Sequence, residues 1–208
     1  MKEPTRPNET IEEFWDNNHK TNSHFYLSGT DGSSQVSILR LHGIVQPNTR
    51  LLNIGIGKGY CTKHWVEHGC LVSVLDISEV AIQRVRNIIE AAYTDSNIED
   101  LPTNYFDYIT CLLVVQHMNT ETLDRHLKYV INSLKPNGVY AVQFAYALYG
   151  KPNKDDLETC QIGESTRTLE EMTYLVEKHG GKILSIFDGG QYPSFEMGWH
   201  ILHISKEV

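Results

Sequence analysis

Long apolar runs are missing from this 208-residue chain. The longest one, near residues 109–115, is far too short to cross a bilayer, and residues 1–15 hold no apolar core of the kind found in signal peptides. The four cysteines form no C-x-x-C pair, so no metal site is expected, and reduced thiols are typical of the cytosol. We therefore expect a cytoplasmic protein that binds neither a metal nor a membrane.

Positive charge is also scarce. There are 18 Lys and Arg residues against 26 Asp and Glu residues, a net charge of -8, and no run of basic residues occurs. Proteins that bind nucleic acids usually carry a basic patch, so a nucleic-acid substrate is disfavoured. The expected partner is a small-molecule substrate, and the chain is expected to act as a monomer or a homodimer.

What the sequence does contain, from residue 50 on, is a regular alternation of apolar strands and amphipathic helices. The predicted strands are 50–54, 71–75, a very short one near 93–96, 105–113, 139–144, 182–187 and 199–205. The predicted helices are 9–18, 60–68, 79–92, 121–134 and 168–179. No helix separates the last two strands, which favours antiparallel pairing at one edge. The pattern predicts an α/β fold with a seven-stranded, mostly parallel sheet and helices on both faces.

The most informative motif lies between the first predicted strand and the helix that follows. It consists of Asn53-Ile-Gly55-Ile-Gly57-Lys-Gly59, and Asp76 ends the next strand 21 residues after Gly55. Glycines allow backbone N–H groups to approach a ligand, and a carboxylate can accept both hydroxyls of a ribose. Together they predict half of a nucleotide-cofactor site. The alternatives are a tight turn without a ligand, and an Asp76 that only caps the next helix.

The spacing of the glycines narrows the choice of cofactor. A dinucleotide fingerprint needs glycine where Tyr60 stands, which disfavours an NAD-dependent oxidoreductase. A P-loop needs Ser or Thr after its lysine, and Lys58 is followed by Gly59. What remains is a turn suited to a ligand that has no pyrophosphate.

At this point the chain resembles the class I S-adenosylmethionine-dependent methyltransferases over residues 35–208. The resemblance rests on the glycine turn and on four further segments in the right order: 75–78, 98–102, 106–109 and 134–138. It implies a Rossmann-like methyltransferase domain at 35–208, preceded by a lid segment at 1–34. It also implies S-adenosyl-L-methionine as cofactor and methyl transfer to an oxygen or nitrogen of a small molecule, such as a sugar or another metabolite.

The resemblance implies cofactor contacts at the ends of the strands. The glycine turn would line the methionine part, the acid of the second strand would bind the ribose, and residues 77, 97 and 98 would contact the adenine. The end of the fourth strand would close over the sulfonium, and Trp15 would join the lid. The full cofactor-binding set is Tyr26, Asn53, Gly55, Ile56, Gly57, Asp76, Ile77, Asn97, Ile98, Cys111 and Leu112.

Two positions depart from the family pattern, because Asn53 and Asn97 stand where an acid is usual. They motivate the alternative of a catalytically weak domain that binds the cofactor, and a protein methyltransferase is a further alternative. His117 follows the fourth strand, where the substrate is expected. It is a candidate general base, since the pKa of histidine lies near neutrality, or a residue that holds the loop through a hydrogen bond.

Overall fold

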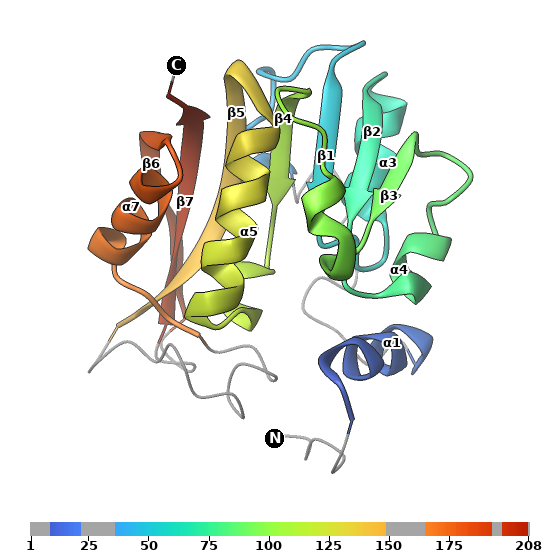
Figure 1. The fold of residues 1–208 in the computed structure, drawn as a ribbon, viewed down its shortest axis with the longest axis horizontal. Coiled ribbons are helices and arrows are strands. Elements are labelled where there is room, and N and C mark those ends of the chain that lie inside the picture. Colours follow the sequence, from blue (N-terminus) through green and yellow to red (C-terminus); the bar gives the residue numbers. More distant parts are fainter. Residues whose placement is uncertain (1–8, 22–35, 149–164, 193–196, 208) are drawn as a thin grey trace.

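The computed structural model describes residues 9–21, 36–148, 165–192 and 197–207, and the fold is a seven-stranded sheet (Figure 1). The strand order is β3-β2-β1-β4-β5-β7-β6. Strands β1 to β5 are parallel, and β7 runs antiparallel to both β5 and β6. The strand bounds are β1 Arg50–Ile54, β2 Leu71–Leu75, β3 Ala91–Tyr93, β4 Phe106–Cys111, β5 Leu134–Ala147, β6 Gly181–Tyr192 and β7 Met197–Lys206. The predicted Rossmann-like fold class is confirmed, including its antiparallel edge.

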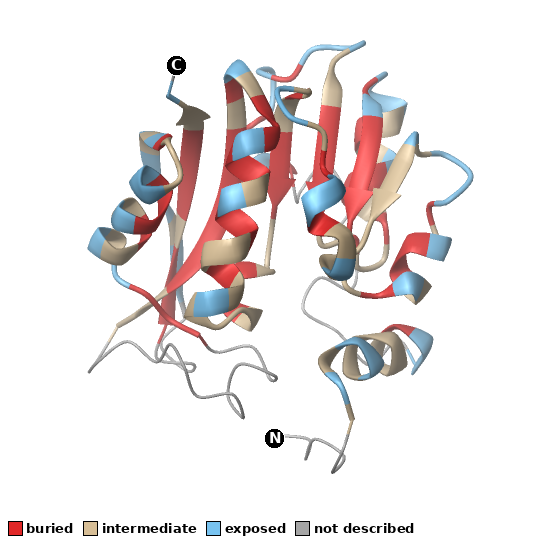
Figure 2. Ribbon diagram, in the orientation of Figure 1, coloured by how far each residue is buried: buried red, intermediate tan, exposed pale blue. Residues whose placement is uncertain are grey.

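Helices cover both faces of this sheet. Their bounds are α1 Ile11–Thr21, α3 Tyr60–Glu67, α4 Glu79–Gln83, η1 Asp95–Asp100, η2 Val115–His117, α5 Thr120–Ser133 and α7 Leu169–Lys178. The apolar sides of α5 and α7 pack on one face, and α3, α4 and residues 36–45 pack on the other. The central strands are buried between these layers, as Figure 2 shows. No helix in these ranges is long and apolar enough to cross a membrane.

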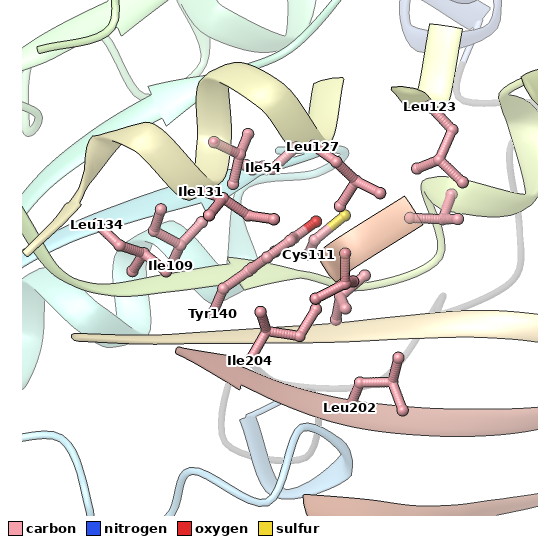
Figure 3. Close-up of a cluster of buried hydrophobic side chains, with 14 of the residues drawn as sticks. Ile54, Ile109, Cys111, Leu123, Leu127, Ile131, Leu134, Tyr140, Leu202 and Ile204 are labelled. Atoms are coloured by element: carbon pink, nitrogen blue, oxygen red, sulfur yellow. The ribbon is translucent and has the colours of Figure 1, made fainter. Parts of the chain in front are cut away.

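The largest of the three core clusters in the described residues lies between the sheet and helices α5 and α7 (Figure 3). It is mainly aliphatic, but the Tyr140 hydroxyl lies there beside the Cys111 thiol and 3.4 Å from Nε2 of His126. Burial raises the pKa of Cys111 to about 12 and lowers that of His126 to about 4. Both side chains are therefore neutral at physiological pH, which suits a position in the core.

One predicted helix, over residues 79–92, is wrong in length. Helix α4 begins where expected, with the Ser78 hydroxyl accepting from the Ala81 N–H, but it ends at Gln83. Turns follow, and β3 pairs with the last three residues of β2. The backbone of residues 91–93 gains partners along an existing strand, and that pairing outweighs a helical preference that is only local.

Candidate functional site

The register of the sheet brings the predicted cofactor residues to one edge. Ile54 at the end of β1 pairs with Leu75 of β2 on one side and with Cys111 of β4 on the other. The residues that follow these three therefore leave the sheet side by side. In open parallel sheets this is where ligands bind.

The glycine turn fills this edge, and its glycines have different reasons to be glycine. Gly55 has φ 76°, and a Cβ there would lie 2.1 Å from a methyl group of Val114, the third residue after β4. Gly57 has φ 55°, but a Cβ there would meet nothing within 4 Å. Gly55 thus permits close packing of the turn on the residues after β4, whereas the space where a Cβ of Gly57 would lie is open.

Asp76 lies directly beside this turn and is almost fully buried. Its Oδ2 accepts from the Ile56 N–H at 2.6 Å, and its Oδ1 accepts from the Ser78 N–H at 2.9 Å. Burial raises the pKa of Asp76 to about 6, against the lowering effect of the neighbouring backbone N–H groups. A carboxylate can accept about four hydrogen bonds, so these two bonds leave capacity for two ribose hydroxyls.

Asn53 is buried beneath the turn instead of facing it. Its Nδ2 donates to the Thr62 hydroxyl at 3.0 Å, and its Oδ1 accepts from the Thr110 hydroxyl at 2.8 Å. The side chain therefore ties β1 to α3 and β4. A neutral amide satisfies these two partners, whereas a carboxylate would be buried without a counter-charge. The structure places Asn53 as a support for the turn.

The predicted adenine contacts are arranged unevenly. Ile77 is half-buried directly after Asp76, which leaves an apolar surface at the edge. Asn97 accepts from the N–H and the hydroxyl of Thr94 through its Oδ1, so only its amide nitrogen remains to meet a ligand. Ile98 is fully buried in the core and supports η1 from below.

The end of β4 combines burial with an unusual backbone. Cys111 faces the core, while the half-buried Leu112 packs toward the opposite face. Leu113 has φ 58°, a conformation that side chains other than glycine seldom adopt, and its N–H donates to Oε1 of the buried Gln143 at 3.3 Å. Backbone strain of this kind is common at functional sites. The sequence gives no signal for Gln143.

His117 lies at the end of η2, one turn beyond β4. Its ring meets the indole of Trp15 edge-on, with ring centroids 4.7 Å apart, and its Nε2 lies 3.4 Å from Nε2 of Gln116. The structure thus brings together the candidate base and the predicted lid aromatic. Tyr26, the other predicted lid residue, lies outside the described residues.

Helix α1 reaches this edge from below α4 in Figure 1. Oδ1 of Asp16 accepts from the Ser78 hydroxyl at 2.5 Å, and Arg84 donates to the carbonyls of Gly57 and His19. Sequence reasoning missed Asp16 and Arg84, because no local pattern links residues that are 62 and 65 positions apart.

The fold and this edge define a nucleotide-binding α/β domain. The open glycine, the buried acid and the apolar neighbour fit a ribose-bearing cofactor without a pyrophosphate. No group of three or more metal-ligating side chains occurs in the described part of the chain.

Comparison with known proteins adds the family. The family model described as "Methyltransferase domain" matches residues 52–142. A glycine/sarcosine/dimethylglycine N-methyltransferase of Actinopolyspora halophila is 33% identical over 118 residues, which are 51% of this chain and 20% of that protein. The chain therefore spans a fifth of the length of this curated relative.

Solved structures agree with the fold. A Haemonchus contortus phosphoethanolamine N-methyltransferase 2, in complex with phosphomonomethylethanolamine and S-adenosylhomocysteine, has a TM-score of 0.73 at 19% identity. The alignment covers 100% of this chain and 62% of that one. The [4+2]-cyclase SpnF has a TM-score of 0.70 at 17% identity, with 86% of each chain covered.

The family model, this relative and the solved structures together support the class I S-adenosylmethionine-dependent methyltransferase family that the sequence resembles. The predicted family and its cofactor, S-adenosyl-L-methionine, are thereby confirmed. The individual cofactor contacts named above remain predictions, and the geometry just described sharpens them.

Proposed function

We propose that this chain transfers the methyl group of S-adenosylmethionine to a nitrogen of a small molecule. The observation that carries the proposal is the edge where Asp76, the open Gly57 and the end of β4 meet. The cofactor supplies a methyl group on a positively charged sulfur, which is already a good leaving group. The protein therefore has mainly to bind, align and exclude water.

Each of these tasks has candidate residues. Asp76 binds the ribose with its remaining acceptor capacity, and Ile77 packs on the adenine. Gly57 allows the backbone to lie against the methionine part. Leu112 and Leu113, the two apolar residues directly after β4, keep the reacting end dry.

A nitrogen acceptor is favoured over an oxygen acceptor by the relatives, two of which are named as N-methyltransferases of small amines. A neutral amine attacks without a base, whereas a hydroxyl must lose its proton. If His117 serves as a base, it does so by taking up a proton from a protonated amine before transfer.

Cofactor binding is tested by calorimetry with S-adenosylhomocysteine. Binding to the native protein and a large loss in Asp76→Ala are expected, with Asp188→Ala, an exposed acid on β6, as the control. An Asp76→Ala variant that binds as tightly as the native protein would remove Asp76 from the site.

Acceptor choice is tested by methyl transfer from radiolabelled S-adenosylmethionine. The panel contains glycine, sarcosine, dimethylglycine, phosphoethanolamine, a simple sugar and a basic peptide. Transfer to an amine is expected. Transfer only to the peptide would support a protein methyltransferase, and tight cofactor binding without any transfer would support a binding module.

We further propose that α1 is the described part of a lid over the cofactor. It touches the cofactor side through Asp16 and the acceptor side through Trp15. Asp16→Ala is expected to weaken S-adenosylhomocysteine binding several-fold, whereas Glu12→Ala on the exposed side of the same helix leaves it unchanged. Equal effects of both variants would contradict the lid.

A further inference from the structure

A buried arginine lies behind the acceptor side of this edge. Arg167 is only 2% exposed, and it directly precedes Thr168, which caps helix α7. Its backbone N–H donates to the carbonyl of Ala145 near the end of β5, at 2.9 Å. The position of Arg167 is therefore fixed by the sheet.

The guanidinium of Arg167 spans the 3-10 turn η2. Its Nη2 donates to the carbonyl of Met118 at 2.6 Å, and its Nη1 donates to the carbonyl of Val115 at 3.5 Å. A third link comes from Ser165, whose N–H donates to the carbonyl of Gln116 at 2.9 Å. Two carbonyls of η2, those of Val115 and Gln116, and the carbonyl of Met118 directly after it are thus held by Ser165 and Arg167.

These contacts matter because η2 is a single short turn. The Val115 carbonyl already accepts from the Met118 N–H at 3.1 Å, but a turn of three residues gains little stability of its own. An arginine fork fixes two acceptors at once in one plane, which a flexible lysine cannot do. The backbone that carries His117 is therefore held in part by residues outside the turn.

We propose that Arg167 is a positioning residue for the reaction: it fixes η2 so that the His117 ring stays against Trp15 at the acceptor side. Only the catalytic purpose of this arrangement rests on the proposed function. The placement itself is a property of the free protein. Arg167 is separated from His117 by 50 residues in the sequence, so no local motif indicates the link.

The first test follows the imidazole itself. The ring resonances of the histidines are recorded by NMR, and His117→Ala identifies that of His117. In Arg167→Lys, which keeps the charge and loses the fork, the His117 and Trp15 ring signals are expected to move. Those of His68 and His179, which lie elsewhere, are expected to stay. Arg50→Lys is the matched control, because the guanidinium of Arg50 lies over Tyr105 at the other end of β1.

The second test separates positioning from simple stability. S-adenosylhomocysteine affinity is expected to stay within about twofold in Arg167→Lys, while kcat with the acceptor found in the panel falls by up to about 100-fold, the effect of a displacement of about 1 Å. In the double variant with His117→Ala, the Arg167→Lys substitution is expected to have no further effect on kcat, because it acts through the same residue.

The outcomes are distinct. Unmoved His117 and Trp15 signals in a folded Arg167→Lys variant would overturn the proposal, as would full additivity of the two substitutions. If the native protein fails to bind S-adenosylhomocysteine, the proposed function fails, yet the NMR comparison still decides the role of Arg167. Arg167→Lys retains the buried charge and most of the volume, so it is the variant used even if Arg167→Met does not fold.

Discussion

Acidification should weaken cofactor binding through Asp76, and the structure gives the size of the effect. Burial is the main reason that the pKa of this carboxyl lies at about 6, and the nearby carboxylate of Asp16 raises it further. The ionised form offers both oxygens as acceptors to the two ribose hydroxyls, whereas in the protonated form one oxygen carries a proton that it donates. Binding should therefore select ionised Asp76 and release a proton wherever the free protein carries one.

The magnitude follows from the ionised fraction of the free protein. With a pKa of about 6, Asp76 is about 90% ionised at pH 7 and about 9% ionised at pH 5. The apparent Kd should therefore rise about tenfold between pH 7 and pH 5, and change little between pH 7 and pH 8. About half a proton should be released per binding event at pH 6.

Protonation of Asp76 has the opposite effect on the stability of the free protein, which it increases. Folding raises the pKa from 3.8, so the stabilising contribution of protonated Asp76 is fully present below that value and is lost as pH rises through about 6. The ionised carboxylate thus costs about 3 kcal/mol at neutral pH. Ligand hydroxyls that donate to it would offset part of this cost.

The assay is calorimetry with S-adenosylhomocysteine from pH 5 to pH 8, in two buffers with different ionisation enthalpies. Asp16→Asn should move the whole curve to lower pH, because it removes a charge that raises the pKa of Asp76. His117→Ala should leave the curve in place, because the pH dependence is assigned to Asp76. A Kd that is constant within twofold across this range would refute the reasoning.

Three further outcomes are expected. Gly57→Ala should cost only about 1–2 kcal/mol of stability, because of its left-handed backbone, yet it should strongly weaken S-adenosylhomocysteine binding in calorimetry. Gly55→Ala should instead impair folding, because its Cβ would clash with Val114, and thermal unfolding measures this loss. Because burial lowers the pKa of His126 to about 4, the native protein should lose stability as pH falls from 6.5 towards 4. His126→Leu should not show this part of the loss, as urea unfolding at pH 4.5 and pH 7 would measure. Asn53→Asp should destabilise the fold at neutral pH by burying a charge between two threonine hydroxyls, and a thermal midpoint equal to that of the native protein would contradict the supporting role of Asn53.

The regular part of the fold was predictable because its signals are local. Residues 50–54 and 71–75 are short apolar runs that end at a glycine turn and an acid, and their strand bounds are those predicted. Helix α5 differs from its prediction by one residue at each end. Where pairing with a distant strand competes with a local preference, as at residues 91–93, the sequence pattern misled.

The site divides in the same way. The sequence indicated Gly55, Gly57 and Asp76, because glycine turns and strand-end acids have fixed spacing along the chain. It did not indicate that the Asn53 amide is used up beneath the turn, or that Asn97 already accepts two bonds. Those facts depend on partners from α3, β4 and the residues before η1.

The sequence by itself determined which segments are buried and where a cofactor is expected, since hydrophobic periodicity and glycine spacing can be read within a few residues. Only the tertiary structure decided what supports and covers the site. Asp16 reaches Ser78, Arg84 reaches His19, and Arg167 reaches η2 across 49 or more positions in the chain. Such hydrogen bonds are specified by where helices and strands end in space, and no local pattern carries that information.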